Sequence, residues 1–158
     1  MLRARTKYLI ANAICLILSS LTLFGCGTIL EPSPRQHVIK FFGAMERNDR
    51  PAIINSLDLV SLMQVSESDY ALKLETPRVM QSPISIVDDL TEDGQTKQVW
   101  FRMTRVVGDQ EIIGDTAYVE VSFLSESKGV QYYNKFGLRK IGEGWRIFSF
   151  RTLNEEGN

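Results

Sequence analysis

The chain of 158 residues contains one histidine and two cysteines, so it has few of the side chains that bind transition metals. Its 18 basic and 19 acidic residues give a formal net charge of -1, and nucleic-acid binders carry a concentrated positive surface instead. The sequence shows no internal repeat and no low-complexity tract. We therefore expect no metal site, no cofactor and no nucleic-acid partner. What is present, 44% hydrophobic and 23% charged residues, is typical of an ordinary globular protein.

The first 26 residues have the three parts of a secretory signal peptide. Arg3, Arg5 and Lys7 form a positive start, and an uncharged, mostly apolar stretch follows over 8–24. An uncleaved transmembrane anchor is the alternative interpretation. The apolar stretch is about as short as a spanning helix can be, and it contains polar residues, which favours the signal peptide.

The apolar stretch ends in Leu23-Phe24-Gly25-Cys26, which resembles the lipobox of bacterial lipoproteins. Leu23, Gly25 and Cys26 match the motif, whereas Phe24 stands where a small or β-branched residue is usual. In lipoproteins the small residue before the cysteine gives the peptidase access to the scissile bond, and the cysteine thiol receives diacylglycerol. The resemblance implies a signal peptide over 1–25.

The same resemblance implies a protein that is held to a membrane by lipid on Cys26, with palmitate among its acyl chains. Two or three acyl chains anchor a protein stably, because each buried CH2 contributes about 0.8 kcal/mol. An Asp directly after the cysteine favours inner-membrane retention in such lipoproteins, and Gly27 stands there. We therefore expect the outer membrane, with the protein facing the periplasm, where the host has two membranes. Residues 26–32 form the lipidated tether.

Removal of the signal peptide changes the charge and the thiol content of the chain. It takes three of the 18 basic residues and leaves 15 against 19 acidic ones, so the mature chain carries a charge of about -4. This charge provides no polybasic patch for anionic lipids. Cys15 leaves with the signal peptide and Cys26 is acylated, so no internal disulfide can form.

The mature chain begins with patterns typical of helices. Ser33 can cap a helix, Pro34 suits its first position, and Gln36 can complete a capping box. The segment 48–51 ends this helix and starts a second one, and a third, shorter helix is predicted within 67–74. The apolar stripes of the first two helices are Val38, Phe41, Phe42, Met45, Ile53, Ile54 and Leu57.

After Pro83 the pattern changes to the alternation that is typical of strands. Ile84 and Ile86 begin it weakly, and Asp93-Gly94 predicts a turn. A strand is then expected from Lys97 to Ile113, with Val99, Phe101 and Met103 on one face and a bend near Gly108. The turn Gly114-Asp115 leads into a second strand over 116–123. Further strands are expected over 130–138 and 145–151.

Helices followed by antiparallel strands predict an α+β fold. The order resembles the NTF2-like superfamily, in particular its small lipoprotein domains of unassigned function. Three stretches carry the resemblance: helix, polar break and second helix over 34–52, GDTAYVEV over 114–121, and GWRI over 144–147. The resemblance implies a cone over 33–153, with N-terminal helices packed on a curved antiparallel sheet around a cavity, and a tail over 154–158.

Enzymes of this superfamily use an Asp, His or Tyr inside the cone, where burial shifts the pKa of an acid or base. His37 is expected to be an exposed or flanking helix residue, because no partner carboxylate is identifiable; a proton shuttle at the rim is the alternative. Asp88 and Asp89 would point to opposite sides of an extended chain and are expected in a solvated loop. Glu120 falls on the outward face of its strand. We therefore predict no catalytic residue.

Four residues with polar groups form a candidate small-molecule pocket. Arg105 continues the face of the strand expected from Lys97, and Tyr132 and Asn134 lie among apolar residues of their strand. Trp145 would add an aromatic wall. The alternative is that Arg105 marks a bend and that the two aromatic residues are ordinary core residues with polar edges.

Together these patterns predict a lipid-anchored, non-catalytic envelope protein that binds a protein partner or a small apolar ligand. The alternative is an NTF2-like enzyme of the isomerase or hydrolase type that uses the cone cavity. A third interpretation is a subunit of an envelope assembly, in which Tyr118 and Tyr133 contact a neighbour from the outer face of the sheet. Pairing into a homodimer through the sheet follows only from analogy with other proteins of this fold.

Overall fold

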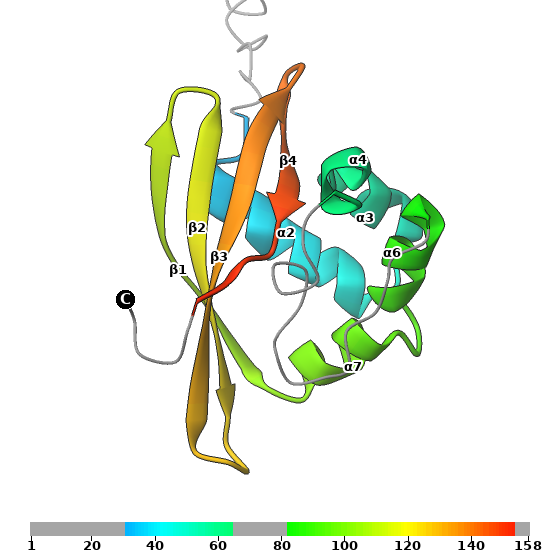
Figure 1. Ribbon diagram of the computed structural model, residues 1–158, viewed down its shortest axis with the longest axis vertical. Helices are drawn as coiled ribbons and strands as arrows, with labels where there is room; N and C mark the ends of the chain where they lie inside the picture. The colour runs from blue at the N-terminus through cyan, green and yellow to red at the C-terminus, as the bar shows by residue number, and fades with distance from the viewer. Residues whose placement is uncertain (1–30, 65–81, 154–158) are drawn as a thin grey trace, which may run out of the picture. The chain divides into compact units, whose positions relative to one another are not determined.

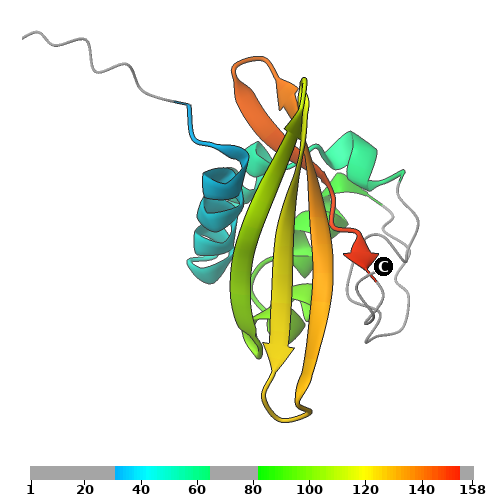
Figure 2. The same cartoon turned by 90° about the vertical axis from the view of Figure 1, so that its left-hand side faces the viewer.

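The computed structural model describes residues 31–64 and 82–153, which form an α+β arrangement with helices on one face of a curved, unclosed antiparallel sheet (Figures 1 and 2). The proposed signal peptide and Cys26, the helix predicted within 67–74 and the tail lie outside the described residues. The helices are α2 (Pro34–Glu46), α3 (Arg50–Ser56), α4 (Leu59–Leu62), α6 (Pro83–Asp89) and α7 (Gln95–Phe101), and the strands are β1 (Thr104–Ile113), β2 (Thr116–Ser125), β3 (Val130–Ile141), β4 (Gly144–Ser149) and β5 (Thr152–Leu153).

Local chemistry starts the first two helices where the sequence predicts. The Ser33 hydroxyl accepts a hydrogen bond from the Gln36 backbone, and the Gln36 side chain accepts one from the Ser33 backbone, both at 3.2 Å. Asp49 then caps α3 by accepting from the Ala52 backbone at 3.1 Å. The expected apolar stripe is buried except for Ile54, which is 43% exposed.

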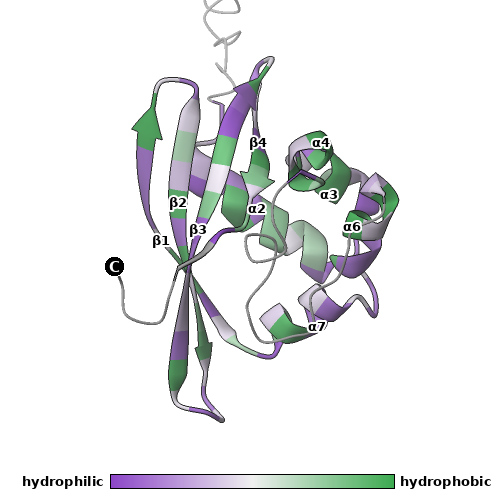
Figure 3. Cartoon of the chain, viewed as in Figure 1, coloured by the Kyte–Doolittle hydropathy of each residue, from purple (hydrophilic) through white to green (hydrophobic). Residues whose placement is uncertain are grey.

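The sheet has the order β1-β2-β3-β4, and β5 continues along β3 beyond β4. The predicted alternation in β2 and β3 is confirmed, and Figure 3 shows hydrophobic and hydrophilic residues alternating along the strands. The expected bend near Gly108 coincides with a register shift between Val107 and Gln110. The final strand is shorter than predicted, because the ladder with β3 ends at Ser149 and the next residue, Phe150, is fully buried. The inward-facing residues of β2 and β3 are Ala117, Val119, Val121, Phe123, Tyr132, Asn134, Phe136 and Leu138.

The prediction of strands between Pro83 and Met103 is wrong. Ile84 and Ile86 lie in α6, where Ser82 and Ser85 form a second capping box. The first part of the strand expected from Lys97 to Ile113 is α7, a helix of only seven residues, and the strand β1 begins only at Thr104. Two turns are too short to separate a helical period from alternation. Trp100, which was not among the residues expected on the inner face, is fully buried.

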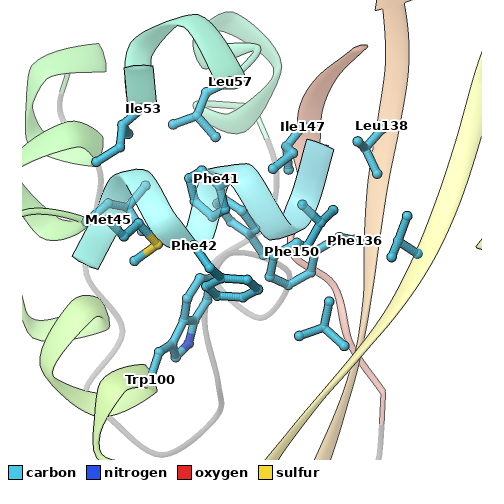
Figure 4. Close-up of a cluster of buried hydrophobic side chains, with 14 of the residues drawn as sticks. Phe41, Phe42, Met45, Ile53, Leu57, Trp100, Phe136, Leu138, Ile147 and Phe150 are labelled. Atoms are coloured by element: carbon cyan, nitrogen blue, oxygen red, sulfur yellow. The ribbon is translucent and has the colours of Figure 1, made fainter. Parts of the chain in front are cut away.

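A cluster of six aromatic rings joins the helices to the sheet. Figure 4 labels five of them, Phe41, Phe42, Trp100, Phe136 and Phe150. Neighbouring rings lie with centroids 4.9 to 6.1 Å apart, at orientations from stacked to edge-on. Full burial of one such side chain stabilises the fold by roughly 1.5–3 kcal/mol. The members of this aromatic cluster are Phe41 and Phe42 of α2, Trp100 of α7, Phe123 of β2, Phe136 of β3, and Phe150.

Candidate functional site

Three of the four predicted pocket residues lie in one half of the sheet. Arg105 of β1 and Tyr132 of β3 are the two cross-strand neighbours of Phe123, so the three residues form one row on the inner face. Asn134 lies in the next inward-facing row, opposite Val121. Adjacent rows of this kind place side chains in reach of one another. The structure therefore brings Arg105, Tyr132 and Asn134 together.

Trp145 lies in a different part of the domain. Its cross-strand neighbour is Lys140, six residues along β3 from Asn134. At roughly 3.3 Å per residue the two positions are about 20 Å apart. Trp145 is buried beside the Lys140 ammonium, whose nitrogen lies 5.7 Å from the ring centroid. The four residues therefore cannot line a single small pocket.

Arg105 is held against aromatic rings. Its guanidinium carbon lies 3.8 Å from the centroid of the Phe101 ring, and its Nη1 donates to the Trp100 carbonyl at 3.3 Å. Burial lowers the pKa of the Arg105 guanidinium, and the charge of Glu46 opposes this shift. The group stays protonated at neutral pH, since an arginine is effectively always charged. Arg105 therefore serves as a fixed cation at the rim of the aromatic cluster, and it cannot act as a base.

Two buried side-chain atoms have no hydrogen-bond partner among the described residues. Asn134 is 1% exposed and donates through Nδ2 to the Phe150 carbonyl at 3.1 Å, but its Oδ1 has no partner among the described residues. The indole nitrogen of Trp100 also has no hydrogen-bond partner among the described residues. The Trp100 ring lies 5.2 Å from Phe123 and 5.6 Å from Phe136, which flank the row of Asn134 on opposite sides. An unpaired donor on Trp100 and an unpaired acceptor on Asn134 are therefore both buried where the aromatic cluster packs on the sheet.

Asp89 is buried, so its placement in a solvated loop was wrong. Its side chain is at the end of α6 and accepts hydrogen bonds from the Thr96 backbone at 3.1 Å and from the Thr96 hydroxyl at 2.5 Å. Its neighbour Asp88 is exposed and pairs with Arg50 at 2.5 Å, and Arg50 also donates to the Thr91 hydroxyl at 3.0 Å. These contacts stabilise the turn between α6 and α7 against the start of α3. Both carboxylates have partners that explain them structurally.

His37 lies half-buried between α2 and α3. Its Nε2 is 3.3 Å from the Ser56 carbonyl oxygen. Burial lowers the pKa of His37, the hydrogen bond to Ser56 opposes this, and the charges of Arg146 and Lys40 lower it further. The imidazole is therefore neutral at pH 7, with Nε2 donating to Ser56. Among the described residues, the groups that act on this imidazole are the Ser56 carbonyl and two cations, and none of them is a carboxylate that could orient a catalytic base.

The outer face of the sheet is free of described helices, as Figure 2 shows with the strands in front. Val106 of β1, Ser122 of β2 and Tyr133 of β3 form one outward-facing row, and Leu124 lies in the next row. Tyr118 lies nearer the other end of this face, with the Lys135 nitrogen 5.9 Å from its ring centroid. We call Val106, Tyr118, Leu124 and Tyr133 the outer patch. Three of its four side chains, Val106, Leu124 and Tyr133, are exposed.

In the part of the chain that the structure describes, no three His, Cys, Asp or Glu side chains are grouped so that they could hold a metal ion. None of the helices in residues 31–64 and 82–153 is long and apolar enough to span a bilayer. Comparison of the chain with models of protein families, with characterised proteins and with solved structures finds no match. A functional assignment therefore depends on the residues themselves.

Proposed function

We propose that the chain is a lipid-anchored, non-catalytic envelope protein that binds a protein partner through the outer face of its sheet. Support for the anchor comes from the signal-peptide pattern and the lipobox-like segment that ends at Cys26. Gly27 supports the outer membrane as the destination, in a host with two membranes.

We further propose that the α+β domain is NTF2-like. The order of α2 and α3 before an antiparallel sheet of neighbouring strands supports this assignment. The polar break between the two helices matches the resemblance as well. The short helices α6 and α7 stand where the sequence pattern suggested a strand, so they are a local feature of this chain's version of the fold.

The packing of the aromatic cluster is the observation that favours a protein partner over an interior ligand. Six rings lie in mutual contact where the resemblance implies a cavity. A ligand inside would have to displace buried rings, each of which stabilises the fold by roughly 1.5–3 kcal/mol. A partner on the outer patch displaces only water from side chains that are already exposed, and tyrosines are effective anchors at interfaces.

Site-specific photocrosslinking in the producing cell tests this function. Tyr133 is replaced by p-benzoylphenylalanine in the full chain, and Gln98, an exposed residue of α7, is replaced in the same way as a control. A single crosslinked protein that appears from position 133 and not from position 98 is the expected result. A crosslink to a second copy of the chain would instead indicate a homodimer or an assembly subunit. If both positions give no crosslink on illumination, the proposed surface is wrong.

The anchor is tested separately by intact mass and cell fractionation. The mature chain should carry the added mass of two or three acyl chains and should sediment with membranes, because this number of chains anchors stably. A Cys26→Ser variant should lack that mass. An unmodified wild-type chain in the soluble fraction would refute the lipoprotein assignment.

A small ligand is the second candidate, and the unpaired Trp100 nitrogen and Asn134 Oδ1 favour it. A molecule with one acceptor and one donor, such as an amide or an alcohol, would pair both atoms. Native mass spectrometry of the mature protein, released gently from detergent, tests this. A bound mass that is lost in an Asn134→Leu variant would support the ligand, and an empty wild-type protein would leave the partner as the function. The NTF2-like enzyme would need an interior acid or base, and neither Asp89 nor His37 is placed to provide one.

A further inference from the structure

Three exposed isoleucines lie at the tips of two neighbouring hairpins. Ile112 and Ile113 end β1, next to the turn at Gly114, and they are 52% and 58% exposed. Ile141 ends β3, next to the turn at Gly142, and it is 47% exposed. Single exposed apolar residues are common on protein surfaces and need no explanation. Here three of them share one end of the sheet.

The strand register places both tips at the same end. Ile113 pairs with Thr116 at the start of β2, and Thr116 pairs with Arg139 near the end of β3. The backbone amide of Lys140 also donates to the Asp115 carbonyl at 2.8 Å, which joins the two hairpins directly. The opposite end of the sheet is the β2–β3 turn.

The described chain begins beside these tips. The Glu31 carboxylate lies 3.0 Å from the Lys140 ammonium, one residue before Ile141. The Arg35 guanidinium donates to the carbonyls of Val107 and Gly108 in β1, each at 3.0 Å. Figures 1 and 2 show the start of α2 at the end of the domain that carries both tips. The tether therefore enters the domain at this end.

The tether is short compared with the domain. Five residue steps separate Cys26 from Glu31, so a fully extended chain spans about 17 Å between them. The 12 residues of β3 extend over about 40 Å. When acyl chains hold Cys26 in the bilayer, the end of the domain with Glu31 stays close to the lipid, and the β2–β3 turn lies farther away if the sheet stands upright.

We infer that the two hairpin tips dock on the lipid bilayer, with Ile112, Ile113 and Ile141 entering its interfacial region. This inference rests on the proposed acylation of Cys26. The charges at the tips determine the kind of contact: Lys140 is paired with Glu31, and Asp115 and Glu143 are exposed acids. With no excess of positive charge, the contact is hydrophobic, and anionic lipid is not required.

The test uses the acylated full-length mature chain in phosphatidylcholine vesicles that contain a doxyl-labelled lipid as quencher. An environment-sensitive dye is attached to Glu143→Cys at the tip or to Lys128→Cys in the β2–β3 turn, which are matched charged, exposed turn positions. Acylation blocks Cys26, so labelling is specific. Quenching should be at least about twofold greater at the tip than at the far turn, and adding anionic lipid should not change it.

A triple variant, Ile112→Ser, Ile113→Ser and Ile141→Ser, should abolish the excess quenching while the chain stays on the vesicles. Val106→Ser is the matched control, because Val106 is as exposed as Ile112 but lies away from the tips, and it should leave the quenching unchanged. Circular dichroism checks that each variant is folded; if the triple variant is not, Ile113→Ser alone should reduce the excess.

The outcomes separate this inference from the proposed function. An acylated chain whose tip dye is quenched no more than the far dye keeps its anchor but overturns the docking. Quenching that persists in the folded triple variant also overturns it, since the isoleucines are then not the contact. A chain without acyl mass that leaves the vesicles overturns the anchor and, with it, the docking that depends on it.

Discussion

Replacing Gly94 with alanine measures how closely the turn between α6 and α7 is packed. Gly94 is the N-cap of α7, with φ -56° and ψ 137°, a conformation that alanine adopts readily. At such a position the change would ordinarily stabilise a protein by about 0.4–1 kcal/mol, because the unfolded chain loses freedom. Here a Cβ atom would lie 2.3 Å from the Asp89 carbonyl oxygen and 2.4 Å from that of Asp88.

These contacts are with the backbone of α6, which cannot rotate away as a side chain could. The end of α6 would have to move, together with the buried Asp89 carboxylate that accepts from Thr96. We expect Gly94→Ala to lower the free energy of unfolding by about 1–3 kcal/mol, the usual cost of overpacking. Steric conflict thus reverses the sign of the ordinary effect.

Urea unfolding followed by tryptophan fluorescence is the assay, since the buried Trp100 lies in the adjacent helix. Gly144→Ala is the control, because a Cβ there meets nothing within 4 Å and its φ is not positive. It should change the free energy of unfolding by less than about 0.5 kcal/mol. A Gly94→Ala protein that is as stable as the wild type, or more stable, would refute the packing argument for this turn.

Three further predictions concern polar contacts. Thr96→Val keeps the shape of the side chain but removes the hydroxyl that donates to Asp89, so the free energy of unfolding, measured in urea, should fall by about 1–3 kcal/mol. Equal stability would show that the hydroxyl contributes nothing. Burial lowers the pKa of His37 in the folded protein, so on acidification the unfolded chain binds this proton first, and stability should fall as the pH drops below 6.5. His37→Gln should remove this part of the pH dependence. An unchanged pH profile of stability in this variant would contradict the lowered pKa of His37. Burial raises the pKa of Asp58, but hydrogen bonds from Ser61 and Arg139 outweigh it and lower the pKa below 3.8, so this carboxylate contributes stability that is lost in acid. Arg139→Met should therefore lower the free energy of unfolding at neutral pH by up to about 1 kcal/mol. The difference in stability between this variant and the wild type should shrink as the pH falls below 3.8. A difference that stays constant with pH would show that the ion pair with Asp58 does not contribute to stability.

Residues close together in the chain made several elements predictable. Ser33 and Gln36 are three residues apart, so the capping box and the start of α2 could be recognised from the sequence. The strands β2 and β3 run for 10 and 12 residues, long enough for alternation to identify their buried faces. The turn at Gly114, with φ +59°, follows from the freedom of glycine in the left-handed region.

The pocket prediction illustrates the limit of such patterns. Periodicity assigned Asn134 and Trp145 to inward faces, and both are buried, but it carries no information on distance along a sheet. Pairing with β3 places Trp145 opposite Lys140, far from Asn134. Trp100, whose ring packs on Phe123 and Phe136 in the rows beside Asn134, was missed because α7 was taken for a strand. A run of apolar residues at positions 99–101, with no polar residue between them, was the available sign that alternation did not hold.

The sequence by itself determined where α2 and α3 begin, which residues of β2 and β3 face inward, and the lipobox-like segment at Cys26, because each depends on neighbours a few residues apart. Only the tertiary structure decided that 95–101 is a helix, that Asp89 is buried against Thr96, and that the aromatic cluster occupies the interior. The reason is physical: a helix of seven residues has little intrinsic stability in water, so its conformation is selected by the burial of Trp100 against rings from distant parts of the chain. That selection depends on contacts that no local pattern contains.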